Sequence, residues 1–234
     1  MLKPLKVSVV VPALNEQNNV RAAIRSILEG FAYYQYDGEI IVVDDGSDDL
    51  TREIALEEKE NDARVKVIVH DENQGIGRSF WDGYSATSGN VITMIPGDNE
   101  NDAIEVFRYV ELLEHVDLVI PFIFNRQVRP VYRNFLSSLY RAIINTTFNI
   151  TLNYTNGTVL YRRSALDQLT TECSGFFFQT DIIIRLIKSN HSFAEVPHLL
   201  RDKVEKKTEA VNFPSFLQVV SGYIKLVRDQ YFRG

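Results

Sequence analysis

The sequence predicts an α/β protein built on a mostly parallel sheet that is flanked by helices. Short runs of branched apolar residues alternate with amphipathic helical segments through the first half of the chain, and polar loops separate them. Strands that are apolar on both faces belong in a sheet that helices cover on both sides. Right-handed crossovers then connect parallel strands, so the carboxyl ends of these strands meet at one edge of the sheet.

The first half predicts a regular succession of strands and helices. The expected strands are residues 6–11, 39–43, 65–69 and 91–95. A helix follows each strand, and its apolar residues recur at helical spacing, as Val20, Ile24 and Ile27 do in the first of these helices. Gly30 is expected to end that helix.

The second half is less regular but still mixes strands and helices. It predicts a strand at residues 117–124, a basic loop, a helix at 134–148 and a strand pair at about 152–161. The segment FFFQTDIIIRLIKS indicates a helix after an aromatic approach, and residues 191–200 indicate a last strand. Residues 202–212 are polar, and we expect a linker there.

A final amphipathic helix is expected from Ser215 onward. One stripe carries the apolar residues Phe216, Val220, Tyr223, Ile224, Val227 and Tyr231. Packing on the domain, or on a second subunit in a homodimer, is one interpretation. The other is a peripheral membrane contact, supported by the flanking cations Lys203, Lys206, Lys207, Lys225 and Arg228. Packing is favoured, because helices at membrane surfaces usually carry more positive charge.

Composition excludes several classes of protein. The chain has 234 residues, a net charge of −6 and 45% hydrophobic residues, which excludes disorder over most of its length. The negative charge disfavours broad nucleic-acid binding. A single cysteine, Cys173, excludes a disulfide scaffold and indicates a reducing compartment. No apolar run reaches the length of a membrane span, and the start MLKPLK leaves no room for a signal peptide. We therefore expect a cytoplasmic protein.

Polar loops follow the first four expected strands, and they predict the ligand site. In an open parallel sheet, ligands bind beyond the carboxyl ends of the strands, where the strand order reverses. The loop residues are Pro12, Ala13, Asn15 and Glu16, then Asp44, Asp45, Gly46, Ser47 and Asp48, then Asn73, Gly75 and Arg78, and finally Gly97, Asp98, Asn99 and Glu100. Because this crevice is rich in carboxylates, a diphosphate is expected to enter it only with a cation.

Seven segments in this order resemble a known enzyme family. They are VVVPALNE, VVDDGSDD, ENQGIGRSFWDGYSATSGNV, IPGDNEND, NGTVLYRRSAL, FFFQTD and EVP. The sequence resembles the inverting nucleotide-sugar glycosyltransferases of family 2, which have a GT-A fold, and most closely their dolichol-phosphate mannosyltransferase-like group. The resemblance implies a GT-A domain at 1–203, with a nucleotide-binding half at 1–115 and an acceptor half at 116–203. Residues 204–234 would form the polar linker and the C-terminal helix.

The resemblance also implies roles for residues of the first half. The nucleotide would contact Pro12, Ala13, Glu16, Asp44, Asp45, Asn73, Gly75, Arg78 and Gly97. Asp98 aligns with the second Asp of the family's D-x-D motif, which holds Mg²⁺ or Mn²⁺ on the donor diphosphate, and Glu100, Asn99 or Asp102 could assist it. The cation would neutralise the leaving nucleoside diphosphate. The sequence departs from the motif at its first position, which is Pro96.

The acceptor half carries a second set of implied residues. Asp181 stands where many inverting relatives place the general base that deprotonates an acceptor hydroxyl. With a lipid-phosphate acceptor, which is already anionic, Asp181 would instead contact the metal or position the acceptor. The cations Arg126, Arg129, Arg133 and Lys203 would contact phosphate. The family's closing R-x-x-G-x-S-K motif is altered here, since Lys203, Lys206, Thr208 and Glu209 replace its defining residues.

Two functions are consistent with these residues. The first is an inverting glycosyltransferase that moves a sugar from a GDP- or UDP-sugar to a lipid-phosphate or glycan acceptor. The alternative is a non-catalytic protein that binds nucleotide sugars, which the altered D-x-D motif would suit. Each acidic residue also has a structural interpretation as a helix cap or a turn, and the arginines as a solvated loop. The histidines His70, His115, His191 and His198 show no metal-ligand spacing, and we assign them no chemistry.

Overall fold

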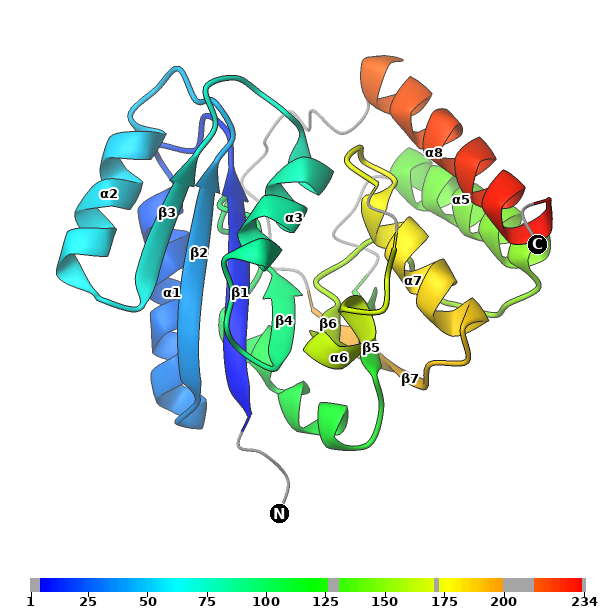
Figure 1. The fold of residues 1–234 in the computed structure, drawn as a ribbon, viewed down its shortest axis with the longest axis horizontal. Helices are drawn as coiled ribbons and strands as arrows, with labels where there is room; N and C mark the ends of the chain where they lie inside the picture. The colour runs from blue at the N-terminus through cyan, green and yellow to red at the C-terminus, as the bar shows by residue number, and fades with distance from the viewer. Residues whose placement is uncertain (1–4, 126–130, 171–172, 200–212, 233–234) are drawn as a thin grey trace.

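A computed structural model describes residues 5–125, 131–170, 173–199 and 213–232, and these form an α/β fold (Figure 1). Seven strands make one sheet in the order β3-β2-β1-β4-β6-β5-β7. Their bounds are Lys6–Ala13 (β1), Asp37–Asp44 (β2), Val65–Val69 (β3), Val91–Met94 (β4), Leu118–Ile123 (β5), Leu160–Arg162 (β6) and Phe193–His198 (β7). β6 runs antiparallel to β4 and β5, and the other neighbours are parallel. The predicted fold class is confirmed.

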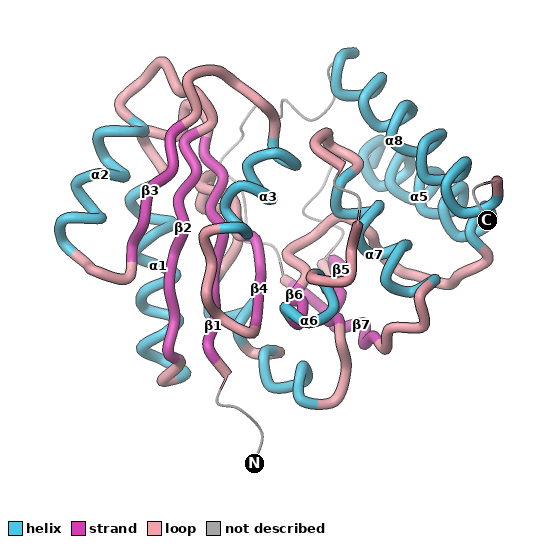
Figure 2. The backbone as a smooth tube through the Cα atoms, in the orientation of Figure 1, coloured by secondary structure: helices cyan, strands magenta, loops and turns pink. Residues whose placement is uncertain are grey.

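Helices cover the sheet and extend beyond one of its ends (Figure 2). Their bounds are Val20–Tyr34 (α1), Thr51–Asn61 (α2), Ile76–Ser85 (α3), Ala103–Phe107 (α4), Val131–Phe148 (α5), Arg163–Leu166 (α6), Phe178–Lys188 (α7) and Phe213–Tyr231 (α8), with a 3-10 helix at Val110–Glu114. No helix among the described residues is both long enough and apolar enough to cross a membrane.

Two apolar layers hold the helices to the sheet. Successive side chains of a strand point to opposite faces, so Val9 of β1 packs in the layer that contains α1 and α4. Val10 packs instead with α3, α6 and α7, where Phe80 and Phe178 are buried. Both faces of the sheet are therefore covered, as its apolar strands require.

The strand order reverses between β1 and β4, because β2 and β3 lie on one side of β1 and β4 lies on the other. Main-chain contacts extend this pairing past the end of β4, since the Gly97 amide donates to the Pro12 carbonyl oxygen at 3.0 Å. The carboxyl ends of β1, β2 and β4 thus flank the position where ligands bind in open α/β sheets.

Two expectations are wrong. Gly30 does not end the first helix, because α1 continues to Tyr34. The sequence predicts a strand pair at about 152–161, but among the described residues of this range only the start of β6 is strand. The backbone of Leu152 bonds instead to the Asn145 side chain of α5, through Nδ2 at 3.0 Å and Oδ1 at 3.2 Å. These bonds satisfy the polar groups that a neighbouring strand would otherwise pair with.

The final helix packs on the domain with part of its apolar surface. Leu226 of α8 is buried against Phe148 of α5 and Phe177, which precedes α7. Three members of the predicted stripe, Val220, Ile224 and Tyr231, stay exposed. α5 and α8 lie side by side at the end of the molecule away from α1 and α2 (Figure 1), where Thr147 and Tyr223 are hydrogen-bonded at 2.8 Å.

Candidate functional site

The predicted nucleotide-binding residues of β1, β2 and the β4 loop lie together at the strand-order reversal. Ala13 and Asp44 are register partners, and the Asp45 amide donates to the Ala13 carbonyl oxygen at 2.9 Å. A Cβ atom on Gly97 would lie 3.0 Å from the Ala13 Cβ atom, so a larger residue would crowd this edge. The structure therefore brings Pro12, Ala13, Asp44, Asp45 and Gly97 to one place.

Asp45 organises the loop that carries the next predicted residues. Its buried carboxylate accepts from the Gln74 and Gly75 amides, each at 2.9 Å, and pairs with His70 Nδ1 at 2.7 Å. A carboxylate has about four acceptor positions, so about one of them is left for a ligand. His70 also contacts Asp82 at 3.1 Å. We assigned His70 no role from the sequence, and its place beyond the end of β3 was the available signal.

The remaining nucleotide-binding candidates lie on the rim of the same edge. Asn73 and Arg78 are exposed, and Arg78 Nε donates to Asp82 Oδ2 at 2.7 Å. Glu16 is half-buried, and its amide donates to Thr51 Oγ1 of α2 at 2.7 Å. Gly75 adopts a φ of 93°, a conformation that favours glycine. The β3–α3 loop can therefore take this shape beside Asp45.

A cavity of about 200 Å³ lies beyond β4, β5 and β7 and contains the predicted metal-binding residues. Asp98 and Glu100 line it, together with Pro96 and Asn101. Asp98 Oδ1 accepts from the Glu100 amide at 3.0 Å, which fixes the turn that follows the strand. Two carboxylates thus border a cavity at the predicted edge of the sheet.

The donor set suits a cation that phosphate oxygens also bind. No group of three His, Cys, Asp or Glu side chains within the described ranges could hold a metal ion by itself. Mg²⁺ in particular is commonly held by one or two carboxylates plus substrate phosphates. Asp98 and Glu100 could provide the carboxylates. Asp102 instead caps α4, because its Oδ1 accepts from the Ile104 amide at 3.0 Å.

Asp181 lies on α7 in a buried ion-pair network. Its Oδ2 accepts from Arg185 Nε at 2.9 Å, and Arg185 also contacts Asp229 of α8 at 2.9 Å. Burial raises the pKa of Asp181, although the Arg185 guanidinium opposes that shift. Asp181 does not line the cavity that holds Asp98, whereas Gln179, two residues earlier, does. The base role of Asp181 stays a prediction.

The predicted phosphate-binding cations cannot be placed at this cavity. Arg126, Arg129 and Lys203 lie outside the described residues, and the backbone alone of Arg133 is described, in the first turn of α5. The cavity has other polar side chains that we did not select from the sequence, and among them are Thr158 before β6 and His198 at the end of β7. Their signal was position, since both stand at the edge where β4 ends.

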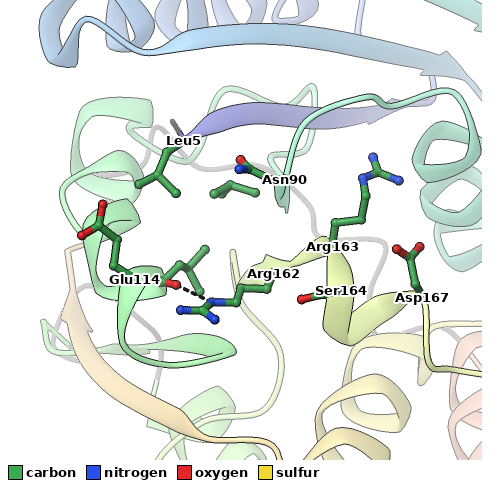
Figure 3. A pocket seen from close by; sticks show the side chains of 9 residues that line it. Leu5, Asn90, Glu114, Arg162, Arg163, Ser164 and Asp167 are labelled. Atoms are coloured by element: carbon green, nitrogen blue, oxygen red, sulfur yellow. Dashed lines mark hydrogen bonds between the residues drawn. The ribbon is translucent and has the colours of Figure 1, made fainter. Parts of the chain in front are cut away.

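A larger cavity, of about 330 Å³, lies at the opposite edge of the sheet (Figure 3). Arg162 and Arg163 line it, but their guanidinium groups point in different directions (Figure 3). Arg163 Nε donates to the Gly89 carbonyl oxygen at 2.6 Å, and Arg162 Nε donates to the Leu113 carbonyl oxygen. Binding sites have polar groups that converge on a ligand. The two arginines of this cavity do not converge, so the cavity at Asp98 is the candidate functional site.

The fold is similar to that of an enzyme of known structure. Glucosyl-3-phosphoglycerate synthase from Mycobacterium tuberculosis, in complex with uridine diphosphate, has a TM-score of 0.71 at 21% identity, and the match covers 95% of this chain and 80% of that one. The same enzyme with Mn²⁺, uridine diphosphate and phosphoglyceric acid has a TM-score of 0.72 at 20% identity, with 95% and 78% covered. At these identities the likeness shows the fold.

Sequence comparison identifies the family. The undecaprenyl-phosphate 4-deoxy-4-formamido-L-arabinose transferase of Salmonella choleraesuis is 29% identical over 175 residues, which are 70% of this chain and 51% of the relative. The chain thus spans about half the length of this curated relative. Residues 8–170 match the model of the family described as glycosyl transferase family 2. That match covers well over half of the sequence and reaches from β1 to β6, and by it the chain belongs to glycosyl transferase family 2.

Proposed function

We propose that the protein is an inverting glycosyltransferase that transfers a sugar from a nucleoside diphosphate sugar to a lipid-phosphate or glycan acceptor. The observation that carries the proposal is the position of Asp98 and Glu100. Both line a cavity at the edge where β1, β2 and β4 end. Family membership supports the reaction class, and the solved relatives that contain uridine diphosphate with Mn²⁺ or Mg²⁺ support a nucleotide and a divalent cation.

Different strand-end loops would bind different parts of the donor. The nucleoside would lie along Pro12, Ala13 and the free acceptor position of Asp45, since nucleobase N–H and ribose O–H groups are donors. The diphosphate would lie beside Asp98 and Glu100, which would hold Mg²⁺ or Mn²⁺. When bound, the cation supplies positive charge that neutralises the leaving diphosphate.

Inverting transfer then needs an acceptor oxygen behind the anomeric carbon. The bond from this carbon to the diphosphate oxygen breaks as the bond to the acceptor oxygen forms, and the nucleoside diphosphate departs with the electron pair. A hydroxyl acceptor loses its proton to a base, for which Asp181 is the candidate. A phosphate acceptor attacks through an oxygen that is already anionic. The name of the Salmonella relative, an undecaprenyl-phosphate transferase, supports the lipid-phosphate alternative.

A membrane-bound acceptor would suit the exposed face of α5. Large apolar residues recur there at helical spacing and stay exposed, namely Tyr132, Phe135, Leu136, Leu139 and Ile143. On α8, Ile224 is exposed as well. In a chain of net charge −6, the sequence around the start of α5 carries three cations, Arg126, Arg129 and Arg133. We therefore assign this face to an anionic lipid surface, where lipid phosphate is presented.

Nucleotide binding tests the proposed function directly. We expect UDP- or GDP-sugars with Mn²⁺ to raise the melting temperature, because a ligand at 100 times its Kd adds about 2.7 kcal/mol, or roughly 5–10 °C for a chain of this size. Asp98→Asn should remove the Mn²⁺-dependent part of this shift. Asp37→Asn is the matched control, since Asp37 is exposed at the other end of β2. If no nucleotide stabilises the wild-type protein, the proposal fails.

Pro96 favours a second candidate function. It lines the cavity at the position of the missing first carboxylate of the D-x-D motif, and fewer anionic ligands weaken cation binding. A non-catalytic nucleotide-sugar-binding protein would show the same thermal shift without turnover. Release of nucleoside diphosphate from UDP- or GDP-sugars, measured with and without acceptor lipid, separates the two functions.

A further inference from the structure

Two buried polar side chains line the Asp98 cavity without a partner of their own. Thr158 Oγ1 and both ring nitrogens of His198 have no hydrogen-bond partner in the described part of the chain, and each residue is 4% exposed. Buried polar groups in folded proteins are nearly always hydrogen-bonded, because leaving them unpaired costs free energy. Two such groups in one cavity therefore indicate a polar ligand.

The two residues reach the cavity from different strands. Thr158 precedes β6, whose antiparallel direction brings its first residues to the edge where β4 ends, and Leu160 pairs there with Thr93. His198 is the last residue of β7 and pairs with Ile123 of β5. His198 belongs to the sheet itself, and Thr158 lies just before β6 begins.

The chemistry of these groups selects among possible ligands. Burial lowers the pKa of His198, although the carboxylates of Asp102 and Glu105 oppose that shift, so the imidazole is neutral near pH 7. A neutral imidazole has one donor and one acceptor nitrogen, and the Thr158 hydroxyl also donates and accepts. Phosphate oxygens can only accept, so they would leave the acceptor nitrogen of the imidazole without a partner. Sugar hydroxyl groups both donate and accept, so they match the pair.

The size of the cavity agrees with this choice. The cavity, at about 200 Å³, is below the roughly 300–1,000 Å³ of pockets for drug-sized ligands. It suits one sugar ring better than a whole nucleotide.

We propose that Thr158 and His198 form the subsite that binds the hydroxyl groups of the transferred sugar, next to the diphosphate at Asp98. The inference rests on the proposed function and adds to it a place for the sugar. It makes the pair a determinant of sugar specificity, while the nucleoside is bound at the ends of β1 and β2.

Comparing a nucleoside diphosphate with the matching nucleotide sugar isolates the contribution of the sugar to binding. We would measure the Kd of UDP against UDP-glucose, and of GDP against GDP-mannose, with Mn²⁺ by calorimetry. Thr158→Val and His198→Phe should each weaken the sugar-containing member by about 2- to 12-fold, the effect of one hydrogen bond, and leave the nucleoside diphosphate unchanged. Thr146→Val and His115→Phe, at exposed positions, are the matched controls. Equal losses for both members of a pair, or no loss, would overturn the subsite.

The unliganded protein gives a second, independent measurement. Because the variants remove unpaired buried polar atoms, their melting temperatures should equal or exceed that of the wild type. A clear fall in both variants would mean that the protein itself, or bound water, already satisfies these groups, and would overturn the proposal. Failure of the wild type to bind UDP and GDP would instead refute the proposed function, and the melting temperatures would still test the subsite.

Discussion

Asp45 combines a structural and a proposed binding role in one carboxylate. Its bonds to His70, Gln74 and Gly75 hold the β3–α3 loop against the end of β2. The sequence predicted Asp45 as a ligand-binding residue from its place after a strand. The sequence could not predict its three partners, because they depend on how the β3–α3 loop folds back over the strand ends. Gly46 permits that approach, since a Cβ atom there would lie 2.6 Å from the Glu72 backbone.

Removing the Asp45 carboxylate should therefore destabilise the protein. In Asp45→Ala, two backbone amides and His70 lose their acceptor, and we expect the free energy of unfolding to fall by about 3 kcal/mol. Urea denaturation measures this change, with Asp48→Ala at an exposed position as the control. A wild-type unfolding midpoint for Asp45→Ala would show that the loop is held in another way.

Glu39, at the edge of the sheet away from the candidate site, should make the free energy of unfolding depend on pH. Burial raises its pKa, but hydrogen bonds from Lys66, Ser8 and Ser88 outweigh this effect and lower it to about 2. The unfolded value is about 4.3, so the stabilisation is full above that pH and is lost as the pH falls toward 2. Glu39→Gln should cost up to ~3 kcal/mol at pH 7.

The matching measurement compares urea denaturation at pH 7 and pH 3. The difference between wild type and Glu39→Gln should shrink at the lower pH, because at pH 3 unfolding lets Glu39 take up a proton, whereas the folded protein keeps the carboxylate paired with Lys66 at 2.8 Å. Glu29→Gln, on the outer surface of α1, should show no such trend. An equal difference at both pH values would contradict the assignment to the Glu39 carboxylate.

At the scale of elements, α5 gives a prediction that the sequence alone did not make. Its buried residues Ile144 and Phe148 pack with α7 and α8, and its other face exposes Phe135 and Leu139. Phe135→Glu combined with Leu139→Glu should reduce binding to vesicles of phosphatidylcholine and phosphatidylglycerol by more than tenfold, since each apolar side chain contributes about 1.5–3 kcal/mol when fully buried.

Co-sedimentation with these vesicles at two salt concentrations checks this prediction. Tyr33→Glu and Leu50→Glu are the controls, because they change exposed apolar residues near α1 and α2. Nucleotide-induced thermal shifts should be the same in all variants. If the wild-type protein does not bind the vesicles but elutes as a dimer in gel filtration, the exposed face of α5 contacts a second copy of the chain instead.

The elements themselves were predictable where local pattern and tertiary context agree. The parallel strands at the start of the chain are apolar on both faces, and their expected positions match β1 to β4 within about two residues. The range 152–161 was wrong because its polar residues fit a strand locally, but the Asn145 side chain binds Leu152 instead. Pairing of this kind depends on contacts outside the segment.

At the scale of the whole molecule, one rule predicts part of the candidate site, and the rest requires the topology. Residues after parallel strands were predicted to gather at one edge, and Asp45, Gly97 and Asp98 are all found there. Thr158 was missed because it precedes a strand, and the antiparallel direction of β6 brings it to the same edge. His198 was missed because histidine spacing in the sequence does not indicate a cavity.

The reversed direction of β6 has a consequence for how this scaffold could diversify. The segment that leads into Leu160 borders the cavity, yet β6 contacts its neighbours over short ladders that end at Leu160. Insertions or deletions upstream of that residue would reshape one wall of the cavity without shifting the alignment of the parallel strands. A library that tests the proposed sugar subsite should therefore vary the number of residues in the segment 153–158 and keep the residues of the opposite wall unchanged.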